Sequence, residues 1–127
     1  MRNKILIIAI SLSFAQCSEY DCKRNQKEDI ENECVIILEK GFQSSFGNAY
    51  LKPEGKNPET GEYCKCSDPG RWWGMYRNQM EKGDTFIKNR GEDFFTIHKK
   101  DTILRVEWGK CDESGKYIIP KNNPPQG

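Results

Sequence analysis

Six cysteines are the residues of this 127-residue chain whose chemistry follows most directly from their type and spacing. An even number of cysteines in a short exported chain is typical of a disulfide framework, here with up to three bridges and the pairing left open. Two of them are separated by one residue, so on a strand they would face the same side and bridge different partners. Their C-x-C spacing lacks the C-x-x-C of a zinc knuckle, and we expect neither a metal nor another cofactor. The disulfide candidates are Cys17, Cys22, Cys34, Cys64, Cys66 and Cys111.

Acid–base chemistry has fewer candidates. His98 is the only histidine in the sequence, and as a general base it would need a nucleophile beside it. No serine stands in a nucleophile-elbow pattern, so the sequence does not indicate a Ser/His/Asp catalytic site. Carboxylates from neighbouring turns could form a hydrolase site if burial raised the pKa of one of them. Turn carboxylates are usually solvated, so we assign no catalytic residue and keep a small carboxylate-dependent hydrolase as the alternative function. These carboxylates are Asp84, Glu92, Asp93 and Asp101.

An aromatic cluster is the leading candidate for a binding surface: Arg71, Trp72, Trp73 and Tyr76. Trp, Tyr and Arg dominate the energetics of protein interfaces, and aromatic rings also stack on sugars. Adjacent residues of a helix point about 100° apart, so we expect one of the two tryptophans to be half exposed. The opposing interpretation places both rings in the core with Arg71 covering their edge.

The first fifteen residues have the pattern of a secretory signal peptide. Arg2 and Lys4 precede an apolar run, Ile5–Ile10, that is too short to span a bilayer. Small residues in Ser13–Ala15 suit cleavage before Gln16. We therefore expect a periplasmic or secreted protein.

A rival interpretation makes Cys17 the lipidated first residue of a lipoprotein, which would contact the membrane only through that lipid. Gln16 stands where a lipoprotein peptidase prefers a small residue, and lipidation would leave an odd number of cysteines. Cleavage after residue 15 would leave 18 basic and 19 acidic residues, a net charge of −1. A near-neutral chain has no bulk electrostatic reason to bind nucleic acid or an anionic membrane.

The remaining sequence predicts one β-rich domain. Residues 34–38 are apolar and β-branched, which favours a strand. Residues 50–51 and 62–64 suggest two more strands around the turn Asn57–Gly61. Segments 85–88, 94–98 and 102–108 predict a three-stranded meander, and 117–119 a short final strand. In the last meander strand, Leu104, Val106 and Trp108 should face one way and the residues between them the other.

One short helix is predicted between the two groups of strands. Asp68 can cap it, Pro69 suits its first position, and Trp72, Tyr76 and Met80 recur every four residues. Gly83 can end it in a left-handed conformation, after which Asp84 can cap the turn into the next strand. We expect Lys88 and Lys99-Lys100 to be solvated edge charges.

The resulting fold class is mainly β: a small, partly open barrel or rolled antiparallel sheet, stapled by disulfides, with one short helix. The charged segment before it is expected to form either a short solvated helix or an irregular arm pinned by Cys22. The expected divisions are a signal peptide (1–15), a charged N-terminal arm (16–33), the β-rich domain (34–120) and a disordered tail (121–127).

Residues 83–108, with Gly-Asp-Thr-Phe-Ile-Lys followed by Phe-Thr-Ile-His-Lys-Lys-Asp-Thr-Ile-Leu, resemble a pattern in short, uncharacterised exported proteins of Gram-negative bacteria. The Gly-Asp-Ser/Thr-x-x-Lys box is its core, and the likeness covers about two-thirds of the chain after the expected signal peptide. The resemblance implies export and a β-rich fold, and it brings no activity and no catalytic residue.

Together these features favour an exported, non-enzymatic module that binds a protein or glycan at the cell envelope. An inhibitor or immunity-type protein is a specific form of this hypothesis. The alternatives are the carboxylate-dependent hydrolase and a purely structural envelope component.

Overall fold

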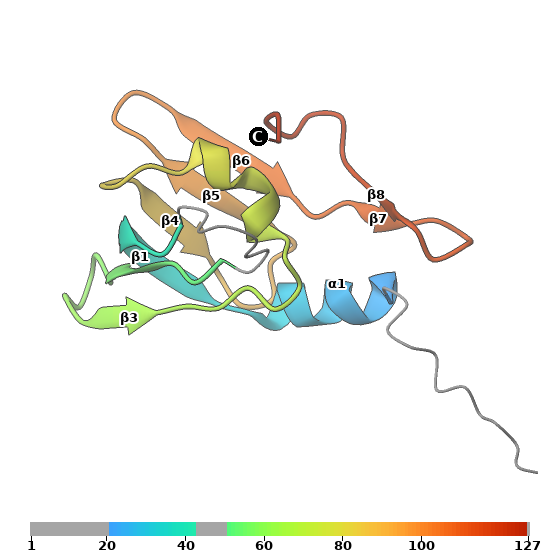
Figure 1. The fold of residues 1–127 in the computed structure, drawn as a ribbon, viewed down its shortest axis with the longest axis horizontal. Coiled ribbons are helices and arrows are strands. Elements are labelled where there is room, and N and C mark those ends of the chain that lie inside the picture. Colours follow the sequence, from blue (N-terminus) through green and yellow to red (C-terminus); the bar gives the residue numbers. More distant parts are fainter. Residues whose placement is uncertain (1–20, 43–50, 127) are drawn as a thin grey trace, which may run out of the picture.

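A six-stranded antiparallel sheet forms the body of the protein in the computed structural model, which describes residues 21–42 and 51–126. The strands lie in the order β3-β2-β1-β4-β5-β6 (Figure 1). Within the described residues the outermost strands, β3 and β6, do not pair with each other, so the sheet is rolled rather than closed into a barrel. The predicted mainly β class is confirmed in its rolled-sheet form. The strands are Cys34–Lys40 (β1), Glu54–Lys56 (β2), Tyr63–Lys65 (β3), Thr85–Lys88 (β4), Phe94–His98 (β5) and Ile103–Glu107 (β6).

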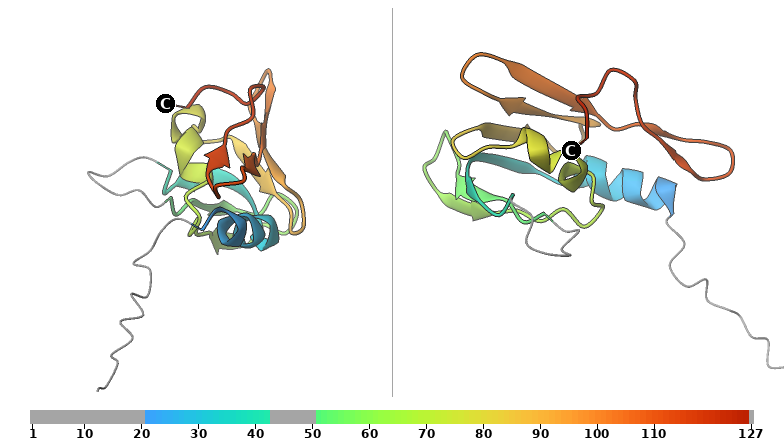
Figure 2. Two further views of the ribbon diagram at one scale, coloured as in Figure 1. Left: turned by 90° about the vertical axis from the view of Figure 1, so that its right-hand side faces the viewer. Right: turned by 45° about the horizontal axis from the view of Figure 1, so that its top comes forward.

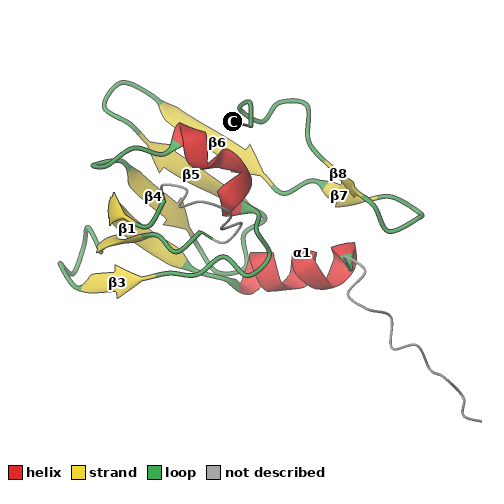
Figure 3. Ribbon diagram, viewed as in Figure 1, coloured by secondary structure: helices red, strands yellow, loops and turns green. Residues whose placement is uncertain are grey.

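Two helices and a small second sheet complete the fold (Figure 3). The helices are α1 (Cys22–Glu31) and the 3-10 helix η1 (Trp73–Gln79), and the second sheet pairs β7 (Lys110–Cys111) with β8 (Tyr117–Ile118). In the left view of Figure 2, β5 and β6 stand on the right with η1 on their left, and no described helix lies on their other side.

The predicted meander is confirmed as β4, β5 and β6, which pair in sequence order. Alternation explains the strands: Phe95 and Ile97 of β5 are fully buried, whereas the residues between and beside them are half-buried. In β6, Val106 is buried and its neighbours Arg105 and Glu107 are exposed, as the sequence pattern predicts. The face that packs inward is therefore set by the period-2 pattern of the strands.

The predicted strand at 34–38 is confirmed as the central strand β1, which extends to Lys40. It pairs with β2 on one side and β4 on the other. Gly55 of β2 permits a close approach, because a Cβ there would lie 1.7 Å from the carbonyl oxygen of Ile37. The prediction of a strand at 50–51 is wrong for Leu51, which is buried in a coil before β2, while Tyr50 lies outside the described residues.

The predicted helix is a short 3-10 helix rather than an α-helix starting at Pro69. Arg71 has a left-handed backbone, with φ 62°, which breaks any helix that begins before it. Tyr76 has non-helical angles, φ −112° and ψ 18°, and divides η1 into two short turns. Gly83 does adopt the expected positive φ, at 94°, before β4 begins.

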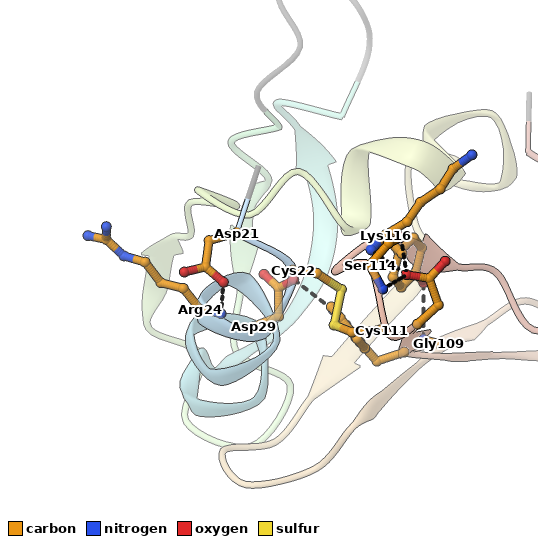
Figure 4. Close-up of a disulfide and its surroundings, with 11 residues drawn as sticks. Asp21, Cys22, Arg24, Asp29, Gly109, Cys111, Ser114 and Lys116 are labelled. Carbon is orange, nitrogen blue, oxygen red and sulfur yellow. Dashed lines mark hydrogen bonds between the residues drawn. A yellow bond between two sulfur atoms is a disulfide. The ribbon is translucent and has the colours of Figure 1, made fainter. Parts of the chain in front are cut away.

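Two disulfides tie the periphery to the sheet. Cys34 of β1 bonds to Cys66, which follows β3, and Cys22 of α1 bonds to Cys111 of β7. Figure 4 shows the second bridge between the helix and the small sheet. Cys64 is half-buried and carries no disulfide among the described residues, and Cys17 lies outside them. The structure thus contains two bridges of the framework that the cysteine count predicts.

Both ends of the described chain pack on the body. Asp21 caps α1 through a hydrogen bond from the backbone N–H of Arg24, at 3.2 Å. At the other end, the Asn123 amide donates to the Tyr76 hydroxyl and to the Glu107 carbonyl. Residues 121–126, which the sequence analysis expected to belong to a disordered tail, thus make side-chain hydrogen bonds to the body of the protein in this structure. The expected signal peptide, residues 1–15, lies outside the described residues.

Candidate functional site

The aromatic cluster proposed from the sequence is part of the core. Trp72, Trp73 and Tyr76 are each at most 1% exposed, so none of them can contact a partner. Arg71 alone remains on the surface. The expectation that one tryptophan would be half exposed is wrong, and the opposing interpretation, with both rings in the core, is correct.

The curvature of the sheet explains why both rings fit inside. Trp72 packs edge-on against Phe95 of β5, with ring centroids 4.8 Å apart. Trp73 packs in the same manner against Phe86 of β4, at 5.0 Å. A flat sheet can bury only one side of a helix. A rolled sheet surrounds the helix, so two adjacent rings that point in different directions can both be buried.

Two carboxyl groups, those of Asp29 and Asp68, are also buried. Asp68 accepts a hydrogen bond from the backbone N–H of Gly74 in the first turn of η1, at 2.9 Å, although the residue directly before this helix is Trp72 and not Asp68 as the sequence predicted. Burial raises the pKa of Asp68 to about 7, although backbone hydrogen bonds oppose the rise. Asp29 of α1 accepts from the indole N–H of Trp108 at 2.8 Å, and burial raises its pKa to about 6. A Cβ on Gly70 would collide with the Asp29 carboxyl group, so the backbone at Gly70 packs directly against that group.

Lys88 contradicts its prediction as a solvated edge charge. It is fully buried, and its ammonium group donates hydrogen bonds to the carbonyl oxygens of Ile30 and Asn32, at 2.9 Å each, and to that of Asn89. Ile30 lies in the last turn of α1, where carbonyl groups lack partners within the helix and favour a cation. Burial lowers the pKa of Lys88. This lysine joins the helix to the sheet and has no part in a surface site.

The turn carboxylates separate into two groups. Asp84 and Asp101 line one open polar cavity of about 700 Å³ together with His98. Glu92 and Asp93 lie in the turn between β4 and β5, at the opposite ends of these strands. Thus three of the five predicted acid–base residues come together.

Within this cavity Asp84 is already engaged. Its carboxylate accepts a hydrogen bond from the Lys99 ammonium group at 2.6 Å and another from the Glu81 backbone N–H at 2.9 Å. These contacts confirm that Asp84 caps the turn before β4, and they correct the prediction that Lys99 is merely solvated. His98 contacts the Thr96 hydroxyl at 3.1 Å. These contacts hold the turn before β4 in place, and they do not pair His98 with a carboxylate as an acid–base mechanism would require.

A larger candidate surface is the side of the sheet turned away from η1, which the sequence did not single out. Cross-strand register aligns two rows of side chains there, and we call these rows the outer sheet face. Each row mixes apolar and polar residues, and no described helix covers them (Figure 2). The rows are Ile37–Thr85–His98–Ile103 and Val35–Ile87–Thr96–Arg105.

The two ends of the first row are the most exposed apolar residues of this face, Ile37 at 37% and Ile103 at 60%. Arg105 extends over the neighbouring Phe94 ring, 3.7 Å from its centroid, and covers it. The sequence contained a signal for this face, since the residues between the core positions of β1 and β4 are themselves apolar. Alternation normally places polar residues on an uncovered side.

Comparison with protein-family models, with curated proteins and with solved structures finds no match to this chain. The resemblance to exported Gram-negative proteins stays a prediction. Among the described residues no helix is long and apolar enough to cross a membrane. The same residues contain no group of three or more His, Cys, Asp or Glu side chains placed to hold a metal ion.

Proposed function

We propose that this protein is an exported, non-enzymatic module that binds a protein partner at the cell envelope through the outer sheet face. The observation that carries the proposal is the alignment of Ile37 and Ile103 with half-buried apolar residues on a side that no described helix covers. On β1 and β4, Ile37, Val35 and Ile87 are neighbouring apolar residues, and Ile103 lies at the other end of the row beyond Thr85 and His98. Exposed apolar groups of this kind mark interaction sites in soluble proteins. An inhibitor or immunity-type protein, which must present a rigid surface to its target, is the specific form we favour.

A protein partner is favoured over a glycan by the position of the aromatic rings. Sugar binding uses exposed ring faces, but Trp72 and Trp73 are buried and the Phe94 ring is covered by Arg105. Among the described residues the one largely exposed aromatic ring is Tyr63 of β3, which is 45% exposed, and a single ring offers little area for stacking on a sugar. Aliphatic side chains at Ile37 and Ile103 instead suit an apolar protein surface. A purely structural envelope component would leave these side chains without a binding role.

Site-specific photocrosslinking tests this proposal. A benzoylphenylalanine residue replaces Ile103 in the full chain, and a matched one replaces Glu113, an exposed residue of the β7–β8 turn. After irradiation in the native cell envelope, we expect one discrete adduct at Ile103 and none at Glu113. The adduct should disappear when Ile37 is also changed to Asp, a substitution that the exposure of Ile37 allows the fold to tolerate. Equal labelling at both positions would reject the outer sheet face as the binding site.

Export is part of the same proposal. Two disulfides are compatible with an oxidising extracellular or periplasmic location. Intact mass of the native protein, measured before and after reduction, should correspond to a chain beginning at Gln16 with at least two bridges. An added acyl mass with Cys17 as the first residue would show lipid anchoring instead.

The hydrolase alternative has one supporting observation, the cavity shared by Asp84, His98 and Asp101. It predicts turnover of a glycan or peptide substrate that is lost in Asp101→Asn and retained in Glu92→Gln, since Glu92 lies outside the cavity. A substrate screen without turnover would remove this alternative and leave the binding proposal standing.

A further inference from the structure

A second cavity, separate from the outer sheet face, lies where β6 passes into the β7–β8 hairpin. Its volume is about 400 Å³, within the range of about 300–1,000 Å³ that is usual for small-molecule sites. Its apolar lining includes the exposed Ile118 and Ile119 and the edge of the buried Trp108. Gly109, Lys110, Pro120 and Lys121 complete the lining.

The apolar wall is held in place from behind. The Trp108 indole donates to the Asp29 carboxyl group and packs edge-on against Tyr117, with ring centroids 4.7 Å apart. Gly109 lets the hairpin close against this wall, because a Cβ there would lie 1.8 Å from the carbonyl oxygen of Ile118. The disulfide at Cys111 ties the same hairpin to α1 (Figure 4). A wall fixed by these contacts loses little conformational freedom when a ligand binds.

The charged residues that line this cavity are all positive. Lys110 and Lys121 are both exposed, and no carboxylate lines the cavity. The ion pairs found among the described residues involve neither lysine. An apolar cavity with only cationic residues beside it is complementary to an anion that carries an apolar body.

We propose that this cavity binds a small amphiphilic carboxylate, with its hydrocarbon chain against Trp108, Ile118 and Ile119 and its carboxylate at Lys110 and Lys121. Burial of the chain supplies the affinity and the two lysines select the charge. This site is independent of the protein-binding role proposed for the outer sheet face.

Isothermal titration with decanoate, kept below the concentration at which it forms micelles, tests the site on the disulfide-intact protein. We expect saturable binding of one molecule that is at least tenfold tighter than binding of decyltrimethylammonium, the cation with the same chain. Reversing both charges, Lys110→Glu with Lys121→Glu, should weaken decanoate binding at least tenfold, and Ile119→Ser several-fold. Lys116→Glu, on the same hairpin but outside the cavity, should change the affinity less than twofold.

The comparison of decanoate with decyltrimethylammonium uses the unaltered protein. It therefore tests the proposal even if one of the variants fails to fold. Equal affinity for decanoate and decyltrimethylammonium would overturn it, as would the absence of saturable binding. Binding to vesicles of anionic phospholipid without binding of monomeric decanoate would also overturn it, because it would show that the hairpin recognises a membrane surface. None of these results bears on photocrosslinking at Ile103.

Discussion

Replacing Asp68 by asparagine should flatten the pH dependence of stability and stabilise the protein at pH 8. Asp68 is 1% exposed, and one of its carboxyl oxygens has no hydrogen-bond partner among the described residues. The other accepts from the Gly74 backbone N–H, a contact that an asparagine oxygen can keep. The substitution thus removes a buried charge while preserving most of the shape.

The size and sign of the effect follow from linkage between protonation and folding. The pKa of Asp68 is about 7 in the folded protein against 3.8 for an unperturbed carboxyl group. Between these values the folded state retains a proton that the unfolded state releases, so the free energy of unfolding falls as pH rises. At about 1.4 kcal/mol for each pH unit, the total loss is of the order of 4 kcal/mol by pH 8. Asp29, whose pKa is raised to about 6, contributes with the same sign.

Urea unfolding at intervals from pH 4 to pH 8 measures this dependence. We expect the wild-type protein to lose stability as pH rises, and Asp68→Asn to lose markedly less, retaining the share due to Asp29. At pH 8 the variant should be more stable by roughly 1–3 kcal/mol, because an unpaired amide N–H offsets part of the gain. Glu113→Gln, which removes one charge from an exposed site, serves as the control and should leave the slope unchanged.

The decisive quantity is the slope against pH. If the wild-type protein becomes steadily more stable from pH 5 to pH 8, Asp68 is ionised in the folded state and the burial argument is wrong. A destabilised Asp68→Asn with an unaltered slope would lead to the same conclusion, since it would identify the carboxylate as a charged helix cap.

Two further predictions concern the attachment of α1. Lys88→Met should lower the free energy of unfolding by about 3 kcal/mol, because it removes three hydrogen bonds from one ammonium group and leaves the Asn32 carbonyl oxygen without that donor. The carbonyl oxygens of Ile30 and Asn89 keep backbone donors from Gly91 and Glu92. The exposed Lys82→Met is the control in the same denaturation series, and equal small losses would contradict the capping role of Lys88. Changing Cys22 and Cys111 together to Ala opens a loop with a sequence separation of 89 and should cost about 4 kcal/mol. A loss below 1 kcal/mol in urea would show that packing alone holds the helix.

The strands were predictable because each depends on its own sequence. Segments 85–88 and 94–98 coincide with β4 and β5, where alternating residues reach the core, and β1 begins at the predicted residue, Cys34. Local patterns of this kind need no knowledge of the partner strand. The turn chemistry was local only in part. Gly83 has the expected positive φ and Asp84 caps the turn before β4, but η1 already ends at Gln79, so Gly83 does not end the helix.

The buried polar and aromatic residues were not predictable, because their burial depends on partners that are distant in the sequence. Asp29 stands within a run of charged residues that reads as solvated surface, yet it is buried by its contact with Trp108, 79 residues away. Lys88 resembles any strand-end lysine until the helix that it caps is known. The tryptophan pair was misassigned for a related reason, since the exposure of adjacent helical residues depends on how far the sheet curves around them.

The outer sheet face was predictable in part. Its residues were assigned to strands correctly, and alternation fixed which of them point away from Phe86 and Phe95 of the core. The absence of a covering helix could not be read from the chain, because it depends on where η1 and α1 pack. Only the cross-strand register places Ile37 and Ile103 in one row.

The bridge between Cys22 and Cys111 determines how the protein carries mechanical load. All six strands of the main sheet lie within the covalent ring that it closes. Tension applied between the segment before Cys22 and the segment after Cys111 passes through the sulfur atoms and bypasses the sheet. While that bond is intact, pulling on the two ends can detach the hairpin β8 strand and the C-terminal residues, but it cannot unravel the strands that form the outer sheet face.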